Sequence, residues 1–304
     1  MLPELFYTIS FSISIVASSF CIFVGFIIVL IVSTNQQYRT ILNMMTCNTA
    51  IASMIYSFFQ IFFAGYGLRG DWDTSQNVCP FRAYLYTVVC IAVPVSYGVQ
   101  AISRLFYGVL YKHRFLLTWQ THWYLICCNY LISVIGPVPI FFIKDGYTLE
   151  IESRLCLTTT KVFGASILSV SVAYLIPLAV IIIVYGIIFL RARQSTRRVG
   201  AVRIQVSQIY SNRIITNLYP TNMKREVTLM RNILILINIL VVAGTPYLVL
   251  VIWQVIVRTP SPPEPSYMLA LLFITVSFMI KMSVLFYMTK DVKNTAIAFL
   301  RKFI

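Results

Sequence analysis

The sequence predicts an all-α membrane protein, a bundle of seven transmembrane helices followed by a short amphipathic helix. Hydrophobic residues make up 59% of the 304 residues and the mean hydropathy is +0.83, whereas charged residues make up only 11%. Such a chain would expose apolar surface everywhere in water, so its solvent is the bilayer. The apolar residues are also gathered into seven runs, each close to the ~20 residues that a membrane helix needs.

These runs give the predicted helices in chain order: residues 6–33, 41–66, 80–104, 122–143, 162–190, 230–257 and 267–288. The first run has no basic leading segment and is too long for the apolar core of a signal peptide, so we interpret it as a retained helix. The sixth and seventh runs are separated by RTPSPPEPS, where the density of proline ends a helix. Strands of a membrane barrel would give shorter, alternating segments. We therefore interpret residues 1–304 as a single seven-helix domain.

The segment after the seventh run has the pattern of a helix that lies on the membrane. Apolar residues recur at helical spacing with basic residues among them, and they are Val292, Ala296, Phe299 and Phe303. This pattern predicts an amphipathic helix over residues 290–303.

The distribution of basic residues predicts the orientation. With the N-terminus outside the cell, the cytoplasmic segments contain 17 of the 24 Lys and Arg residues, and the C-terminus is cytoplasmic. Topology and attraction to anionic lipid explain most of the net charge of +15. The basic residues are spread over four segments beside membrane helices, which disfavours a nucleic-acid partner. The longest such segment, residues 191–229, is expected to be a basic cytoplasmic loop.

The seven cysteines divide according to this topology. Five lie within the apolar runs, where a free cysteine is usually a small buried hydrophobe. Cys79 and Cys156 alone fall on the outer, oxidising side, which makes them the candidates for a disulfide.

Three spacings within the helices carry a resemblance. Arg104 follows Cys79 by 25 residues, about 37 Å of helix, which is enough to cross the bilayer. In the fifth run Tyr185 follows Pro177 by eight residues, and in the sixth Glu226 precedes Pro246 by twenty. With seven helices in this orientation, these residues resemble the rhodopsin-like family of G-protein-coupled receptors over nearly the whole chain.

The resemblance implies a disulfide between Cys79 and Cys156, kinks at Pro177 and Pro246, and activation by outward movement of the sixth helix. It implies a plasma-membrane receptor that binds an extracellular ligand and a heterotrimeric G protein, with no metal or other cofactor. The implied activation switch consists of five residues: Ser103, Arg104, Tyr185, Glu226 and Tyr287.

The departures from the family pattern mark a divergent member. Ser103 stands where the family has an acid beside the arginine, and Gly244 stands at the position of the sixth-helix tryptophan. Ser53 stands where the family has the aspartate of its sodium site. We hypothesise that the loss of the acid at Ser103 raises ligand-free signalling, and that Lys281 occupies the space of the missing sodium ion.

The predicted ligand pocket lies between the outer halves of the helices. Its candidate residues by helix depth are Tyr86, Thr87, Cys90, Ser169, Tyr247 and Phe273. Tyr86 stands where amine receptors have an aspartate, and Ser277 stands where opsins have a lysine, which disfavours an amine ligand and retinal. The second outer loop, KDGYTLEIESRLCLTTTK, alternates apolar and polar residues and predicts a hairpin lid, which favours a peptide ligand.

Two other functional classes fit the sequence less well. An enzyme is disfavoured, because the only histidines are His113 and His122 and no metal-binding or nucleophile–base set is present. A polytopic membrane transporter is the stronger alternative. It would typically have internal repeats and several charged residues at the midplane, whereas this chain has no repeat and only Lys281.

Overall fold

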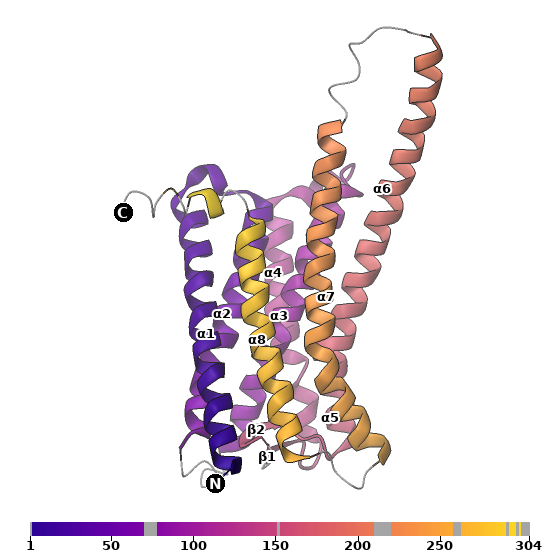
Figure 1. Cartoon of the computed structure of the whole chain (residues 1–304). Coiled ribbons are helices and arrows are strands. Elements are labelled where there is room, and N and C mark those ends of the chain that lie inside the picture. Colours follow the sequence, from indigo (N-terminus) through magenta and orange to yellow (C-terminus); the bar gives the residue numbers. More distant parts are fainter. Residues whose placement is uncertain are drawn as a thin grey trace.

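The computed structural model describes residues 2–69, 78–150, 153–209, 220–257, 263–289, 292–295 and 298. Within these residues it has seven helical spans long and apolar enough to cross a membrane. The spans stand side by side in one bundle, with a two-stranded hairpin and the start of the first helix at the same end (Figure 1). The predicted fold class, an all-α bundle of seven transmembrane helices, is confirmed.

The seven spans are built from ten helical segments in the described residues. Their bounds are α1 Leu2–Thr34, α2 Ile41–Gly67, α3 Cys79–Gly108, α4 Trp119–Ile135 with the 3-10 helix η4 Val138–Phe142, α5 Phe163–Val170 joined through η5 Ser171–Leu175 to α6 Ile176–Ile209, α7 Pro220–Val257 and α8 Glu264–Met288. The fifth span of the bundle is therefore α5–η5–α6, the sixth is α7 and the seventh is α8.

Local sequence signals fix several helix ends. The Thr40 side chain accepts a hydrogen bond from the Asn43 backbone N–H at the start of α2, and Thr118 does the same for Thr121 at the start of α4. Both are N-caps that satisfy one of the free donors of the first turn. The α-helix of the fourth span ends before Pro137, earlier than the predicted residue 143, because prolines 137 and 139 break its hydrogen-bond pattern.

The fifth and sixth spans extend beyond the apolar runs that predicted them. The basic, polar composition predicts a loop over residues 191–229, but α6 continues to Ile209 and α7 already begins at Pro220. Figure 1 shows both helices projecting past the other spans at the end opposite the hairpin. Arginine, alanine and glutamine in this stretch are good helix formers, so loss of hydropathy marked the end of the apolar run and not the end of the helix.

The predicted amphipathic helix over residues 290–303 lies largely outside the described residues. Residues 292–295 and 298 are helical, and Val292 is fully buried against the cluster formed by α1 and α8.

The core of the bundle is centred on α3, the most buried of the described spans. Several polar side chains inside it are satisfied by the preceding turn of their own helix: Thr49, Ser53, Thr87 and Thr275 each donate to a carbonyl four residues earlier. This pattern suits an apolar solvent, which offers no water to satisfy polar groups.

Candidate functional site

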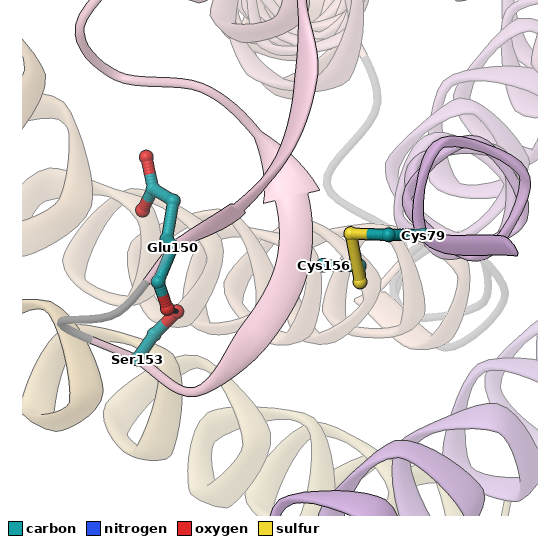
Figure 2. The surroundings of a disulfide bond; sticks show 4 residues. All are labelled: Cys79, Glu150, Ser153 and Cys156. Carbon is teal, nitrogen blue, oxygen red and sulfur yellow. Dashed lines mark hydrogen bonds between the residues drawn. A yellow bond between two sulfur atoms is a disulfide. The ribbon is translucent and has the colours of Figure 1, made fainter. Parts of the chain in front are cut away.

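A disulfide-anchored hairpin closes one end of the bundle. Strand β1, Tyr147–Glu150, pairs antiparallel with β2, Leu155–Thr158, as the alternation of the sequence predicted. Figure 2 shows Cys156 on β2 bonded to Cys79 at the start of α3, with Cα atoms 5.3 Å apart. The predicted disulfide is confirmed, and it holds the hairpin against the central helix.

A buried carboxylate fixes the base of the hairpin. Glu150, on β1 in Figure 2, accepts hydrogen bonds from the backbone N–H and the hydroxyl of Thr160, at 2.8 and 2.9 Å. The Ser153 N–H donates to the Glu150 carbonyl across the turn. Hydrogen bonds of this kind are needed to keep a buried carboxylate in place.

Arg154, at the hairpin turn, joins the hairpin to α1. Its guanidinium makes two hydrogen bonds to the Glu4 carboxylate, at 2.8 and 2.5 Å, and lies 4.2 Å from the ring centroid of Tyr7. The hydrogen bond to Glu4 raises the pKa of Arg154. Arg154 also has a φ of 56°, a left-handed conformation that a side chain other than glycine adopts rarely. No local sequence pattern predicts this contact, because its two residues are 150 positions apart.

A cavity of about 140 Å³ lies directly beneath the hairpin. We call it the main cavity. It is bounded by α3, by Leu157 and Thr158 of β2, by α5 and η5, by α7 and by α8. Lys281 of α8 is the only charged side chain among the described residues that line it.

Five of the six candidate pocket residues line the main cavity, namely Tyr86, Thr87, Cys90, Ser169 and Tyr247. Phe273 does not: its side chain is 42% exposed on the outer surface of α8, and the next residue, Ile274, lines the cavity in its place. Neighbouring residues of a helix are turned about 100° apart, so an error of one position moves a side chain from the cavity to the lipid face.

A polar network forms the wall of the main cavity toward α2. The Tyr86 hydroxyl donates to Gln60 Oε1 at 2.9 Å, and the Tyr56 hydroxyl lies 3.5 Å from that of Tyr86 and 3.4 Å from Thr275 Oγ1. Thr87 and Thr158 bring their hydroxyls to 3.2 Å, which links α3 to the hairpin. The polar groups of this wall are therefore already paired within the protein.

On the opposite wall, a π-helical turn approaches α7 closely. Ser171–Leu175 form the π turn just before Pro177, whose missing N–H disturbs the regular ladder. Tyr174 of this turn donates to the Val241 carbonyl at 3.1 Å, and its ring packs against the backbone of Gly244. A Cβ atom on Gly244 would overlap that ring. The glycine at the family's tryptophan position thus makes room for a tyrosine from the fifth span.

Replacing Gly244 with Ala is expected to lower stability by about 1–3 kcal/mol, since the added methyl overpacks a fitted contact. Thermal unfolding of the purified protein measures the change. In a Tyr174→Val background the same Gly244→Ala change is expected to cost much less, because the smaller side chain leaves room for the methyl. Additive losses in the double variant would contradict this account of the contact.

A second, smaller cavity of about 20 Å³ surrounds Arg104 on the far side of the main cavity from the hairpin. We call it the Arg104 cavity. The Arg104 guanidinium donates to the Tyr185 hydroxyl at 3.5 Å, which joins α3 to α6. The volume of the Arg104 cavity exceeds the 10–15 Å³ that one water molecule needs.

The other residues of the implied switch are placed differently. Ser103 is fully buried, and its hydroxyl has no hydrogen-bond partner among the described residues. Tyr287 is not brought to Arg104: it is 67% exposed, with Lys293 Nζ 4.0 Å from its ring centroid. Glu226 belongs to α7, but its side chain lies outside the described part of the chain.

The two cavities share one lining residue of α7. Leu240 lines both the main cavity and the Arg104 cavity and is 6% exposed. Pro246, inside α7, lies between Gly244 and Tyr247, two further residues of the main cavity wall. A movement of α7 would therefore change both cavities together.

The described residues contain no cluster of three or more His, Cys, Asp or Glu side chains suited to hold a metal ion. Among the described residues, the main cavity offers a ligand largely apolar walls and one cation.

The chain is similar in sequence to a family of known proteins. Residues 25–288 match the family described as "7 transmembrane receptor (rhodopsin family)". The chain is 24% identical over 179 residues to the alpha-1D adrenergic receptor of Mus musculus, a match that covers 58% of this chain and 31% of that receptor. It is 28% identical over 144 residues to G-protein coupled receptor 161 of Danio rerio, covering 46% of this chain and 27% of that protein.

Among solved structures, the crystal structure of squid rhodopsin superposes with a TM-score of 0.73 at 14% identity. The superposition covers 96% of this chain and 84% of that one, which establishes a shared fold. The sequence matches span about a third or less of the length of these two receptors.

Proposed function

Because this chain belongs to the rhodopsin family of seven-transmembrane, G-protein-coupled receptors, we propose that it binds an extracellular ligand in the main cavity and activates a heterotrimeric G protein. In this proposal the hairpin end faces the outside of the plasma membrane and the projecting ends of α6 and α7 face the cytoplasm. The excess of Lys and Arg in the segments at that end supports the orientation.

The observation that carries the proposal is the position of Leu240 between the two cavities. A ligand that contacts Tyr247 or Gly244 acts on α7 at the level of Pro246, and Leu240 transmits the displacement to the surroundings of Arg104. Outward movement of α7 then opens the cytoplasmic end and frees Arg104 for the G protein. The ligand shifts the equilibrium only by the difference in its affinity for the two states.

The volume of the main cavity bears on the size of the ligand. The hairpin alone favoured a peptide, but about 140 Å³ accommodates a molecule of the size of benzene. A small ligand is therefore the better proposal. The paired hydroxyls of Tyr86 and Tyr56 and the lack of an acid among the lining residues disfavour an amine.

Distance measurements between spin labels test the movement of α7. We expect a pair at Ile235→Cys on α7 and Tyr124→Cys on α4, both exposed positions, to move apart when a purified heterotrimeric G protein binds. Cys127 and Cys128, which are exposed, are first replaced by Ser. A control pair at Tyr124 and the exposed Leu30 of α1 should keep its distance. An unchanged α4–α7 distance in the G-protein complex would refute the proposed movement.

A further inference from the structure

Lys281 is a buried cation without a counter-charge in the part of the chain that the structure describes. Its side chain is 1% exposed, and Nζ has no hydrogen-bond partner there. Nζ lies 4.0 Å from the ring centroid of Phe278 and 6.0 Å from that of Tyr97. Two aromatic faces compensate a desolvated ammonium only in part, because a ring attracts a cation more weakly than an anion does. Burying a charge without an anion is costly, so such a group is usually functional.

The cation belongs to the wall of the main cavity, and no carboxylate is among the described residues that line it. The other described lining residues are apolar or neutral. An anion that entered the cavity would therefore meet one positive charge and no negative one. An amine would meet only repulsion.

The other residues of the cavity wall determine the size and polarity of the uncharged part of the ligand. Leu157 of β2, Val170 of α5, and Leu271, Ile274 and Phe278 of α8 give the cavity an apolar lining. Lys281 lies 17 residues after the start of α8, about 25 Å along the helix, so the charge is deep and the apolar space lies between it and the hairpin. A cavity of this size holds a compact group such as a phenyl ring or a short alkyl chain.

We propose, on the basis of the function proposed above, that the main cavity binds a small monocarboxylate. Its carboxylate pairs with the Lys281 ammonium at the bottom of the cavity, and its aromatic or short aliphatic body fills the space toward Leu157. A single negative charge matches the single cation. A phosphate monoester, with up to two charges and a strong hydration shell, would lose more hydration than one ammonium replaces.

Thermal unfolding of the purified receptor, without any G protein, tests this assignment. The probes are benzoate, phenylacetate, hexanoate and octanoate, each compared with its primary amide, which has nearly the same shape and no charge. At least one acid is expected to raise the unfolding temperature in a concentration-dependent way, and its amide is expected to need at least about tenfold higher concentration.

Variants of the lysine separate binding from folding. Lys281→Met is expected to fold and to be at least as stable as the wild type without ligand, because it removes an uncompensated buried charge. It should lose the response to the acid, whereas Lys281→Arg keeps a preference for the acid over the amide. Lys144→Met, which removes an exposed lysine next to the hairpin, should respond as the wild type does.

Three results would overturn the proposal: equal stabilisation by acid and amide, an acid response that survives in Lys281→Met, or no response to any of the four acids. A fourth result would also overturn it: the acids have no effect, and borohydride traps benzaldehyde or hexanal covalently on Lys281. In that case the lysine would bind its ligand by forming an imine and not by ion pairing. None of these measurements uses signalling, so a failure of G-protein coupling would leave the assignment of the ligand class intact.

Discussion

Replacing Arg104 with Ala is expected to reduce G-protein activation at least tenfold at matched surface expression. The guanidinium is held by a long hydrogen bond to the Tyr185 hydroxyl at the edge of a water-sized cavity, so little energy is needed to redirect it. In the family that this chain belongs to, the arginine turns toward the G protein when the sixth span moves. The measurement is ligand-free activation in cells for each Gα class.

The matched control is Arg114→Ala, which removes an exposed arginine from the turn that follows α3. It is expected to keep the signal of the wild type, because general attraction to anionic lipid is shared among many basic residues. Equal signals from wild type and Arg104→Ala with every Gα class tested would mean that Arg104 is only an interfacial charge.

Replacing Ser103 with Asp is expected to lower ligand-free activity by about tenfold. Ser103 is fully buried next to Arg104, and its hydroxyl has no hydrogen-bond partner in the part of the chain that the structure describes. A carboxylate at this position is therefore expected to pair with the guanidinium. An ion pair at a partly hydrated membrane edge is worth about 1–3 kcal/mol, and stabilising the inactive state by that amount shifts a two-state equilibrium by roughly tenfold or more.

Ser103→Asn provides the control, because it has the size of Asp without its charge. Asn should leave ligand-free activity close to that of the wild type when surface expression is matched. If Asp and Asn give the same activity as Ser, the missing acid does not set the basal activity of this receptor.

The sequence predicted those parts of the molecule that depend on hydropathy and on cysteine topology. Seven runs of apolar residues predict seven spans because the bilayer requires continuous helices of about that length. The disulfide between Cys79 and Cys156 could be predicted because the charge distribution gives the orientation of the helices, and in that orientation these two cysteines alone lie on the outer side. The hairpin followed from alternation within one short loop, a local signal.

What the sequence could not predict depends on rotation, continuity and long-range contact. Phe273 and Ile274 exchange roles through one step around α8, which no apolar run resolves. The extension of α6 to Ile209 was hidden because a helix can leave the membrane without ending. The contacts of Arg154 with Glu4 and of Tyr174 with Gly244 join distant segments and have no local signature.

Lys281 is the intermediate case. Its position in an apolar run indicated a functional group inside the bundle, but only the structure relates it to the main cavity and to the ring of Phe278. The sequence-based hypothesis that it replaces a sodium ion stays a prediction. The ligand assignment adds a second, separately testable role for the same cation.

Nucleotide exchange on purified heterotrimeric G proteins, catalysed by the wild-type receptor in lipid nanodiscs, is the most direct test of the central claim. We predict that the receptor accelerates release of GDP from at least one class of heterotrimer, since Leu240 lines both the Arg104 cavity and the main cavity and in our proposal couples them. No acceleration with any class, together with solute flux across proteoliposomes containing the same protein, would contradict the account and favour a transporter.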